Sequence, residues 1–203
     1  VLAQTFALDA NVHASSGQPA GSLSWAACPA NLPVAQGFVA NEAAFGSLPV
    51  GHITPHIEED GNLRRQPALI CYQDKVYPAL FIVALSKALS VGVSPIEAGT
   101  GLLAPAWRLP SPSFEKSGLP LDSQGLVRVP WALHPDAFIS LSAADVLAGR
   151  TPKNLLQNAW VIVGSSALGL NDRIATPFSG NSAGLMVHAQ LLRGVLDGVI
   201  PTQ

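Results

Sequence analysis

The expected fold rests on residues 159–164, which read AWVIVG. A short run of β-branched and aromatic residues that ends in glycine is typical of a strand buried on both faces of a sheet. Residues 165–183 then form a long polar loop, and residues 184–197 carry apolar side chains at helical spacing. Gly198 follows as a helix terminator. Strand, loop and helix in this order indicate an α/β domain.

The middle of the chain is expected to be rich in hairpins. Asp60-Gly61 lies between two extended, partly apolar runs, residues 48–57 and 64–72. This pair suits a tight turn, so we predict a hairpin tip over residues 59–62 with Gly61 at positive φ. Further short turns are expected at residues 73–74 and 122–125, and further strands over residues 1–6, 34–40, 102–109 and 126–131.

Two more helices complete the expected fold. Pro78 is predicted to open a helix that runs to Ser90 and is apolar on nearly every side, hence buried. Ser142 is predicted to cap a short helix over residues 143–147, which Gly149 ends. The sequence therefore predicts a single α/β domain over residues 1–203, with a mixed sheet packed with helices in a layered sandwich.

The composition favours a globular domain and argues against nucleic-acid binding. Hydrophobic residues make up 48% of the chain, which is enough for a sizeable core. The net charge is −2 and the eleven Lys and Arg residues are scattered, so the basic stripe that nucleic acids require is absent. No run approaches the roughly 18 apolar residues of a membrane span. The chain opens inside an expected strand without an initiator Met, which suggests a piece of a longer protein.

The two cysteines, Cys28 and Cys71, leave two interpretations open. They could be two buried free thiols, or they could form one disulfide in an oxidising compartment. Neither has the clustered Cys or His partners that a zinc site usually needs.

Residues 180–184 read GNSAG and match the Gly-x-Ser-x-Gly nucleophile elbow of α/β-hydrolases. That motif needs a sharp strand-to-helix turn, with an acid and then a histidine later in the chain. Asp197 is the one downstream acid, no histidine follows it, and Pro177 suits a central strand poorly. A helix N-cap at Ser182 is the simpler interpretation, and we expect no catalytic residue.

Two further motifs also have simpler explanations. Residues 164–169, GSSALG, lack the Lys and the hydroxyl residue that a phosphate-binding loop places after its second Gly. His52, His56 and the acidic residues 58–60 resemble metal ligands, but Pro55 forbids a regular helix there. On a strand the two histidines would lie about 13 Å apart, at roughly 3.3 Å per residue. We therefore expect a strand-exit loop, a solvated turn, and no metal or cofactor.

Segments along the chain, in order, resemble the CHASE type-2 domain, a sensory extracellular domain associated with cyclases and histidine kinases. The similar segments are residues 51–53 (GHI), 60–61 (DG), 64–67 (RRQP), 77–80 (YPAL), 121–125 (LDSQG), 142–149 (SAADVLAG), 160–167 (WVIVGSSA), 176–178 (TPF) and 184–189 (GLMVHA), with Gly169 and Asp172. The resemblance is clearest over residues 51–198, whereas residues 1–48 are only loosely similar, as if the family's N-terminal part were truncated. Glu58 stands where the family usually has Asp, and Met186 stands where it usually has an acidic residue.

The resemblance implies an extracytoplasmic sensory domain on the periplasmic side of a bacterial cell membrane, tethered by transmembrane helices in the full-length protein. It would respond to an unknown small molecule or protein and act on a cytoplasmic adenylate or diguanylate cyclase or a kinase; a dimeric state is left open. The domain itself is not expected to be an enzyme. Two alternatives are a periplasmic protein-interaction module without a small ligand and a serine hydrolase that uses Ser182.

Ligand-binding residues are expected around the loop of residues 165–183, because ligands of α/β sheets tend to bind beyond the carboxyl ends of strands. The candidates are Asp60, Arg64, Asp172, Arg173, Thr176 and His188. In the alternative interpretation, Asp172 and Arg173 only order the loop, through an ion pair with Arg64 or Asp60. In the ligand-binding interpretation, ordering of the loop by the ligand would shift the helix over residues 184–197, which would relay the signal.

Overall fold

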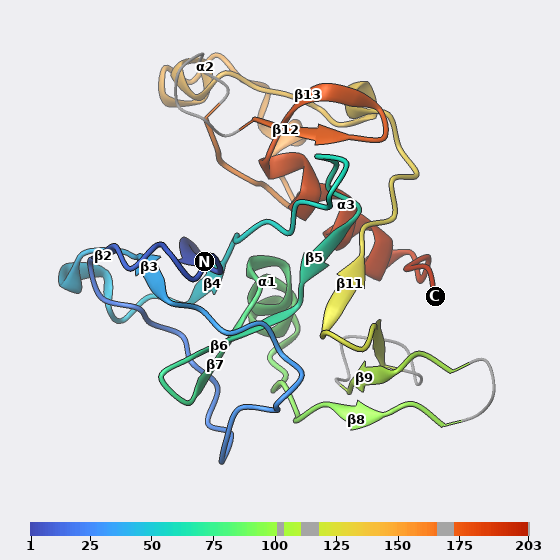
Figure 1. Cartoon of the computed structure of the whole chain (residues 1–203). Coiled ribbons are helices and arrows are strands. Elements are labelled where there is room, and N and C mark those ends of the chain that lie inside the picture. The colour runs from blue at the N-terminus through green and yellow to red at the C-terminus, as the bar shows by residue number, and fades with distance from the viewer. Residues whose placement is uncertain (101–103, 111–117, 166–172, 203) are drawn as a thin grey trace.

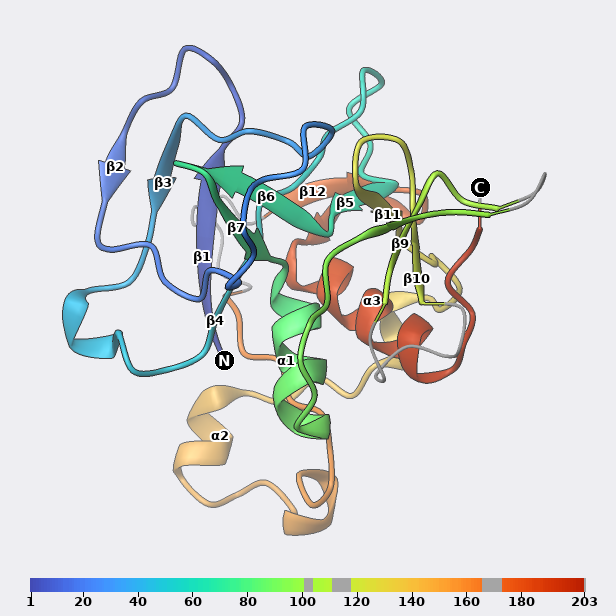
Figure 2. The ribbon, with the colours of Figure 1, turned by 90° about the horizontal axis from the view of Figure 1, so that it is seen from below.

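A computed structural model describes residues 1–100, 104–110, 118–165 and 173–202. Its short, mixed strands and few helices confirm the predicted α/β class (Figure 1). An N-terminal sheet lies to one side of two packed helices, and a three-stranded sheet lies on the other (Figure 2). The layers follow from the apolar faces of short elements, none of which can bury its own side chains alone.

The N-terminal sheet has the strand order β2-β3-β1-β4. Its strands are β1 (Leu2–Ala7), β2 (Ser15–Ser16), β3 (Gly37–Val39) and β4 (Val50–His52). β1 is antiparallel to β3 and parallel to β4, so the sheet is mixed as predicted. The strand expected over residues 1–6 is confirmed, whereas the one expected over residues 34–40 is shortened to β3.

Hairpins dominate the middle of the chain, as predicted. The strands here are β5 (Arg65–Pro67), β6 (Leu69–Tyr72), β7 (Lys75–Pro78), β8 (Glu97–Ala98), β9 (Trp107–Leu109), β10 (Leu119–Leu121) and β11 (Leu126–Arg128). β6 and β7 pair across Gln73 and Asp74, whose φ angles of 48° and 58° fit the two-residue hairpin turn expected there. The turn over residues 122–125 is also present, and the hydrogen bond from Gly125 N to Asp122 O is 3.1 Å long.

Helices α1 (Leu80–Leu89) and α3 (Leu185–Leu196) pack against each other beside this middle region. α1 buries Phe81, Ile82 and Leu85 completely, which confirms a core helix. The prediction that Pro78 opens it was wrong. Pro78 is the last residue of β7, where it pairs with Leu69, and the helix begins two residues later.

A glycine brings β4 and α1 into direct backbone contact. A Cβ atom on Gly51 would lie 2.5 Å from the Cα atom of Leu80, at the first residue of the helix. Only a residue without a side chain allows that approach. The contact fixes the neighbouring His52 against the N-terminal end of α1.

A disulfide joins Cys28 to Cys71, with Cα atoms 5.9 Å apart. Cys71 belongs to β6 and is buried, whereas Cys28 lies in a partly exposed segment before it. Of the two interpretations that the sequence left open, the structure therefore has the bonded one.

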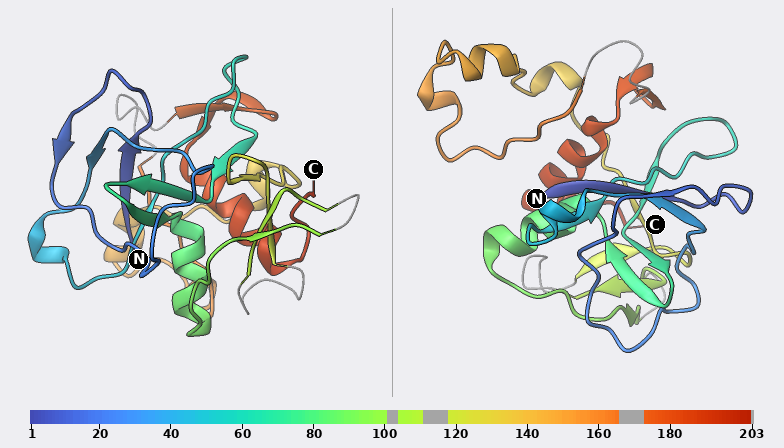
Figure 3. Two further views of the ribbon diagram at one scale, coloured as in Figure 1. Left: turned by 60° about the horizontal axis from the view of Figure 1, so that its bottom comes forward. Right: turned by 90° about the vertical axis from the view of Figure 1, so that its left-hand side faces the viewer.

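Residues 138–165 form an arm that projects from the rest of the domain (Figure 3). It contains α2 (Ala143–Leu147), preceded by Ser142 as predicted, and the 3-10 turn η3 (Lys153–Leu155). Two further 3-10 turns, η1 (Ala43–Phe45) and η2 (Pro135–Ala137), lie outside the arm.

The strand predicted over residues 159–164 was wrong. This segment has no strand assignment, and the side chains of Trp160, Val161 and Val163 are 45%, 58% and 85% exposed. Ile162 alone in the apolar run packs on the core. The segment runs from the arm back toward the core. None of the described strands pairs with it.

The loop predicted over residues 165–183 is partly a hairpin. β12 (Arg173–Thr176) and β13 (Ser179–Ala183) pair across a tight turn, with a register shift between Ile174 and Thr176. α3 follows directly, and Gly198 at φ 66° ends the chain's last helix as expected.

Candidate ligand-binding site

A tight turn over residues 58–62 builds the most charged part of the surface. Glu58 N donates to Asn62 O at 3.0 Å, and Gly61 N donates to Glu58 O at 2.8 Å. Asp60 Oδ1 accepts a hydrogen bond from Asn62 N at 3.0 Å. Gly61 has φ 81°, and His56 and Arg65 form an antiparallel bridge below the turn. The predicted hairpin tip is confirmed.

Replacing Gly61 with alanine should lower the free energy of unfolding by about 1 kcal/mol, because alanine disfavours positive φ. Nothing lies within 4 Å of a Cβ atom at this position, so the cost is conformational rather than a clash. Gly180→Ala is the matched control, since a Cβ atom also has open space there and the backbone φ is not positive. Urea denaturation of both variants measures the difference. Equal stabilities for the two would contradict the prediction.

Arg64 and Arg65 join three carboxylates in one ion-pair network. Arg64 Nη1 lies 2.9 Å from Glu58 Oε2, and Arg64 Nη2 lies 2.7 Å from Asp60 Oδ2. Arg65 Nε lies 2.9 Å from Glu58 Oε1, and Arg65 Nη1 lies 2.9 Å from Asp122 Oδ2. Arg64 and Arg65 thus contact the two carboxylate oxygens of Glu58. Arg65 also links the turn to the β10–β11 connection through Asp122.

The network sets the protonation of its members. Hydrogen bonds from Arg65, and then from Arg64, hold the pKa of Glu58 below its usual value although partial burial opposes this. The guanidinium of Arg64 holds the pKa of Asp60 well below its usual range. Asp60 in turn raises the pKa of Arg64, and Glu58 raises that of Arg65. Glu58, Asp60, Arg64 and Arg65 therefore stay ionised at neutral pH.

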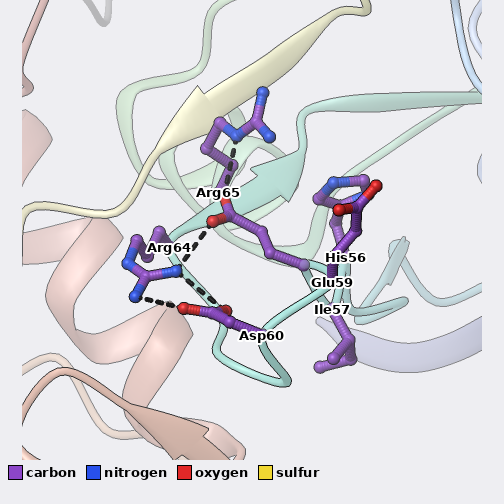
Figure 4. A pocket seen from close by; sticks show the side chains of 7 residues that line it. His56, Ile57, Glu59, Asp60, Arg64 and Arg65 are labelled. Atoms are coloured by element: carbon purple, nitrogen blue, oxygen red, sulfur yellow. Dashed lines mark hydrogen bonds and ion pairs between the residues drawn. The ribbon is translucent and has the colours of Figure 1, made fainter.

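An open cleft of about 480 Å³ lies over this network (Figure 4). Its lining residues come from one continuous stretch of chain: His56, Ile57, Glu58, Glu59, Asp60, Arg64 and Arg65. Arg64 contacts both Glu58 and Asp60, while His56 and Glu59 lie together on the other side of the view (Figure 4). Among the described residues Glu59 has no ion pair, so its carboxylate is available to a ligand.

The turn is hydrogen-bonded to β12. Leu63 N donates to Ala175 O at 2.9 Å, and Asn62 and Ala175 form a parallel bridge. Two of the predicted ligand-binding residues, Arg173 and Thr176, lie on this strand, next to the turn that carries two others, Asp60 and Arg64. The structure thus brings four of the six predicted residues to neighbouring segments.

Of the six predicted residues, Asp60 and Arg64 line the cleft, whereas Arg173, Thr176 and His188 are not among its lining residues. Asp172 lies outside the described residues. His188 is on α3, is only 4% exposed, and does not line the cleft. Arg173 is exposed and donates to Asn181 O at 3.1 Å; no ion pair between it and Asp60 is present among the described residues.

Ser182 occupies an interior position in β13 rather than a nucleophile elbow. It is 7% exposed, and its Oγ atom lies 3.0 Å from Thr176 Oγ1. The prediction that it caps the last helix was wrong, because Gly184 is the N-cap of α3. Strand β13 extends to Ala183, so the helix begins too late for Ser182 to reach its first amides.

A sequence model of the CHASE2 domain matches residues 1–203. The chain belongs to the CHASE2 domain family. The match includes the N-terminal 48 residues, over which the sequence resemblance is loose. CHASE2 domains are extracellular sensory domains of signalling receptors. No curated protein and no solved structure matched the chain.

The described residues of this CHASE2 domain contain no group of three or more His, Cys, Asp and Glu side chains arranged to hold a metal ion. His52 faces the interior and is fully buried, whereas His56 lines the cleft. None of the described helices combines the length and the apolar character needed to cross a membrane.

Sequence reasoning missed Arg65 and Asp122 as members of the CHASE2 domain's charged site. Both residues lie in segments that resemble the family, but they are 57 positions apart. Their pairing depends on the antiparallel contact of β5, which carries Arg65, with β11, which follows the Asp122 turn. Glu58 and Glu59 were noticed only as parts of a solvated turn.

Proposed function

We propose that this domain is the extracytoplasmic sensing part of a bacterial transmembrane receptor and that it binds a small polar ligand in the cleft over residues 56–65. The receptor would pass the signal to a cytoplasmic cyclase or kinase. Membership of the CHASE2 family supports the sensory role. The disulfide supports an oxidising, periplasmic location, because such bonds persist outside the cytoplasm.

One observation carries the assignment of the cleft. The turn that lines it is hydrogen-bonded through Leu63 to β12, and β12 leads through β13 directly into α3. A ligand that alters the position of the turn therefore acts on a strand two elements away from the last helix. Such a ligand can shift α3 only if it binds one position of the turn more tightly than another.

The lining residues define the class of ligand. Arg64 and Arg65 present guanidinium groups that favour a carboxylate or phosphate, and Glu59 presents an unpaired carboxylate that favours an ammonium group. Partial exposure of all three groups suits a small, hydrated molecule. Amino acids and other zwitterions meet both requirements.

Thermal unfolding with the common amino acids, small dicarboxylates and polyamines as probes tests the proposal. A ligand present at about 100 times its Kd should raise Tm by roughly 5–10 °C. The rise should be lost in Arg64→Ala and Glu59→Gln. Arg150→Ala is the control, because its ion pair with Asp145 lies on the arm, away from the cleft. A probe that stabilises all four proteins equally would place the site elsewhere.

A periplasmic protein-interaction module is the second candidate, and the arm favours it. Ile139, Leu147 and Val163 are 71%, 89% and 85% exposed there, and large apolar side chains in water commonly mark partner surfaces. Loss of signalling on Val163→Asp, with every cleft variant fully active, would favour this candidate over ligand sensing.

A further inference from the structure

Two histidines are buried away from the cleft without hydrogen-bond partners. His52, at the end of β4, is 0% exposed, and His188, in α3, is 4% exposed. Both ring nitrogens of His52 and Nδ1 of His188 have no partner among the described residues. Buried polar atoms are normally hydrogen-bonded, since an unpaired one costs about 1–3 kcal/mol. The unpaired nitrogens of His52 and His188 therefore lower the free energy of unfolding.

The two histidines lie on β4 and α3, and helix α1 packs between these two elements. β4 packs on α1, where Gly51 approaches Leu80, and α1 packs on α3. The ring of Phe6 covers His52 edge-on, with centroids 6.3 Å apart. His188 is flanked in α3 by Val187 and by Leu191 and Leu192, which are buried in the main core. A charge on either imidazole would therefore enter an apolar environment.

Burial keeps both histidines neutral. Burial, with a smaller contribution from the charge of His188, lowers the pKa of His52 to about 3. Burial lowers the pKa of His188 to about 4. The other ionisable groups on β4, its neighbours β1 and β7, and helices α1 and α3 are Lys75, Tyr77, Lys87 and Arg193. None of these four contributes to the shift of either histidine.

We propose that His52 and His188 make the packing of α3 on α1 an acid-sensitive latch, which opens when these side chains take up protons. No covalent bond breaks; each imidazole binds one proton from water and becomes hydrated as α3 moves away from α1. This inference concerns the helix pair and does not depend on the ligand cleft. An extracellular domain meets the pH outside the cytoplasm, so protons would be its signal at this position.

α3 is the element that should move. It carries one histidine of the latch, and its buried Val187, Leu191 and Leu192 pack in the main core. A hydrogen bond from Gln190 Nε2 to Leu133 O, 2.5 Å long, also holds it. The disulfide instead ties β6 to the segment before it. β6, β7 and α1 should therefore remain packed while α3 opens.

The direction and size of the effect follow from the two histidine pKa values. A base whose pKa is lower in the packed state than in the open state weakens packing as the pH falls below the open-state value near 6.5. With a packed-state pKa of about 4, His188 alone should favour opening roughly 20-fold more at pH 5 than at pH 7. The stabilisation of the α1–α3 packing by neutral His188 is fully present above about pH 6.5, and it is lost as the pH falls from 6.5 to about 4.

Hydrogen exchange read by mass spectrometry at pH 7 and pH 5 tests the latch, after correction for the intrinsic rates. Amides of α3 should open at least about 20-fold more at pH 5 in wild type, while those of β6, β7 and α1 keep their protection. His188→Gln and His188→Met should each reduce this pH dependence by roughly the 20-fold share of His188, and either variant suffices if the other does not fold. His13→Gln, at an exposed position, should behave as wild type.

Three results would overturn the latch. One is unchanged protection of α3 at pH 5, and another is the same pH dependence in the position-188 variants as in wild type. The third is loss of protection in α3, α1, β6 and β7 together, which would mean that acid unfolds the whole domain.

Discussion

Breaking the Cys28–Cys71 disulfide is expected to lower the free energy of unfolding by about 4 kcal/mol, since the bond closes a loop of 43 residues in sequence separation. The bond restricts the unfolded chain far more than the folded one, and longer loops gain more. The loop contains β3, β4 and β5, so its closure also holds the N-terminal sheet next to the β6–β7 hairpin. A loss of this size is a large fraction of a typical domain's stability.

Cys28→Ser is the variant of choice for this test. Cys28 is partly exposed, so serine there removes the bond and leaves the buried Cys71 side chain in place. Guanidinium denaturation of oxidised wild type, reduced wild type and Cys28→Ser measures the effect. The two proteins without the bond should agree within about 1 kcal/mol. Two free thiols in denatured, unreduced wild type would show that the bond does not form.

Asp122→Ala should destabilise the domain by about 3–5 kcal/mol, because it removes one partner of a largely buried ion pair. Asp122 is 3% exposed and its Oδ2 atom pairs with Arg65. Its Oδ1 atom accepts hydrogen bonds from Gln124 N and Leu126 N, both at 2.9 Å. Alanine would leave the amides of Gln124 and Leu126 without their acceptor and Arg65 Nη1 without its carboxylate partner.

Two further variants isolate the cause of the Asp122 effect. Asp122→Asn keeps an acceptor for the two amides and loses the charge, so we expect an intermediate loss of about 1–3 kcal/mol. Asp145→Ala removes an exposed ion pair with Arg150 and should cost less than about 1 kcal/mol. Urea denaturation gives all three values. A cost for Asp122→Ala no larger than that for Asp145→Ala would show that burial adds nothing to this carboxylate.

The sequence by itself determined the features that depend on neighbouring residues. Asp60-Gly61 specified its turn because glycine adopts positive φ without steric cost. The turn at residues 73–74 was also predicted, although Gln73 and Asp74 adopt positive φ without being glycine. Helices α1 and α3 were predicted to within a few residues from continuous apolar patterns. The same local signals, in collinear order, identified the family.

Only the tertiary structure decided which segments meet. The run at residues 159–164 has the composition of a buried strand, yet it is exposed, because burial needs a neighbouring strand that local sequence cannot supply. Arg65 and Asp122, and likewise Cys28 and Cys71, are far apart in sequence and are brought together by tertiary packing. The isolation of His52 and His188 from polar partners also comes from packing between helices and sheet. Pairings of this kind depend on long-range packing, which the pattern of one segment does not encode.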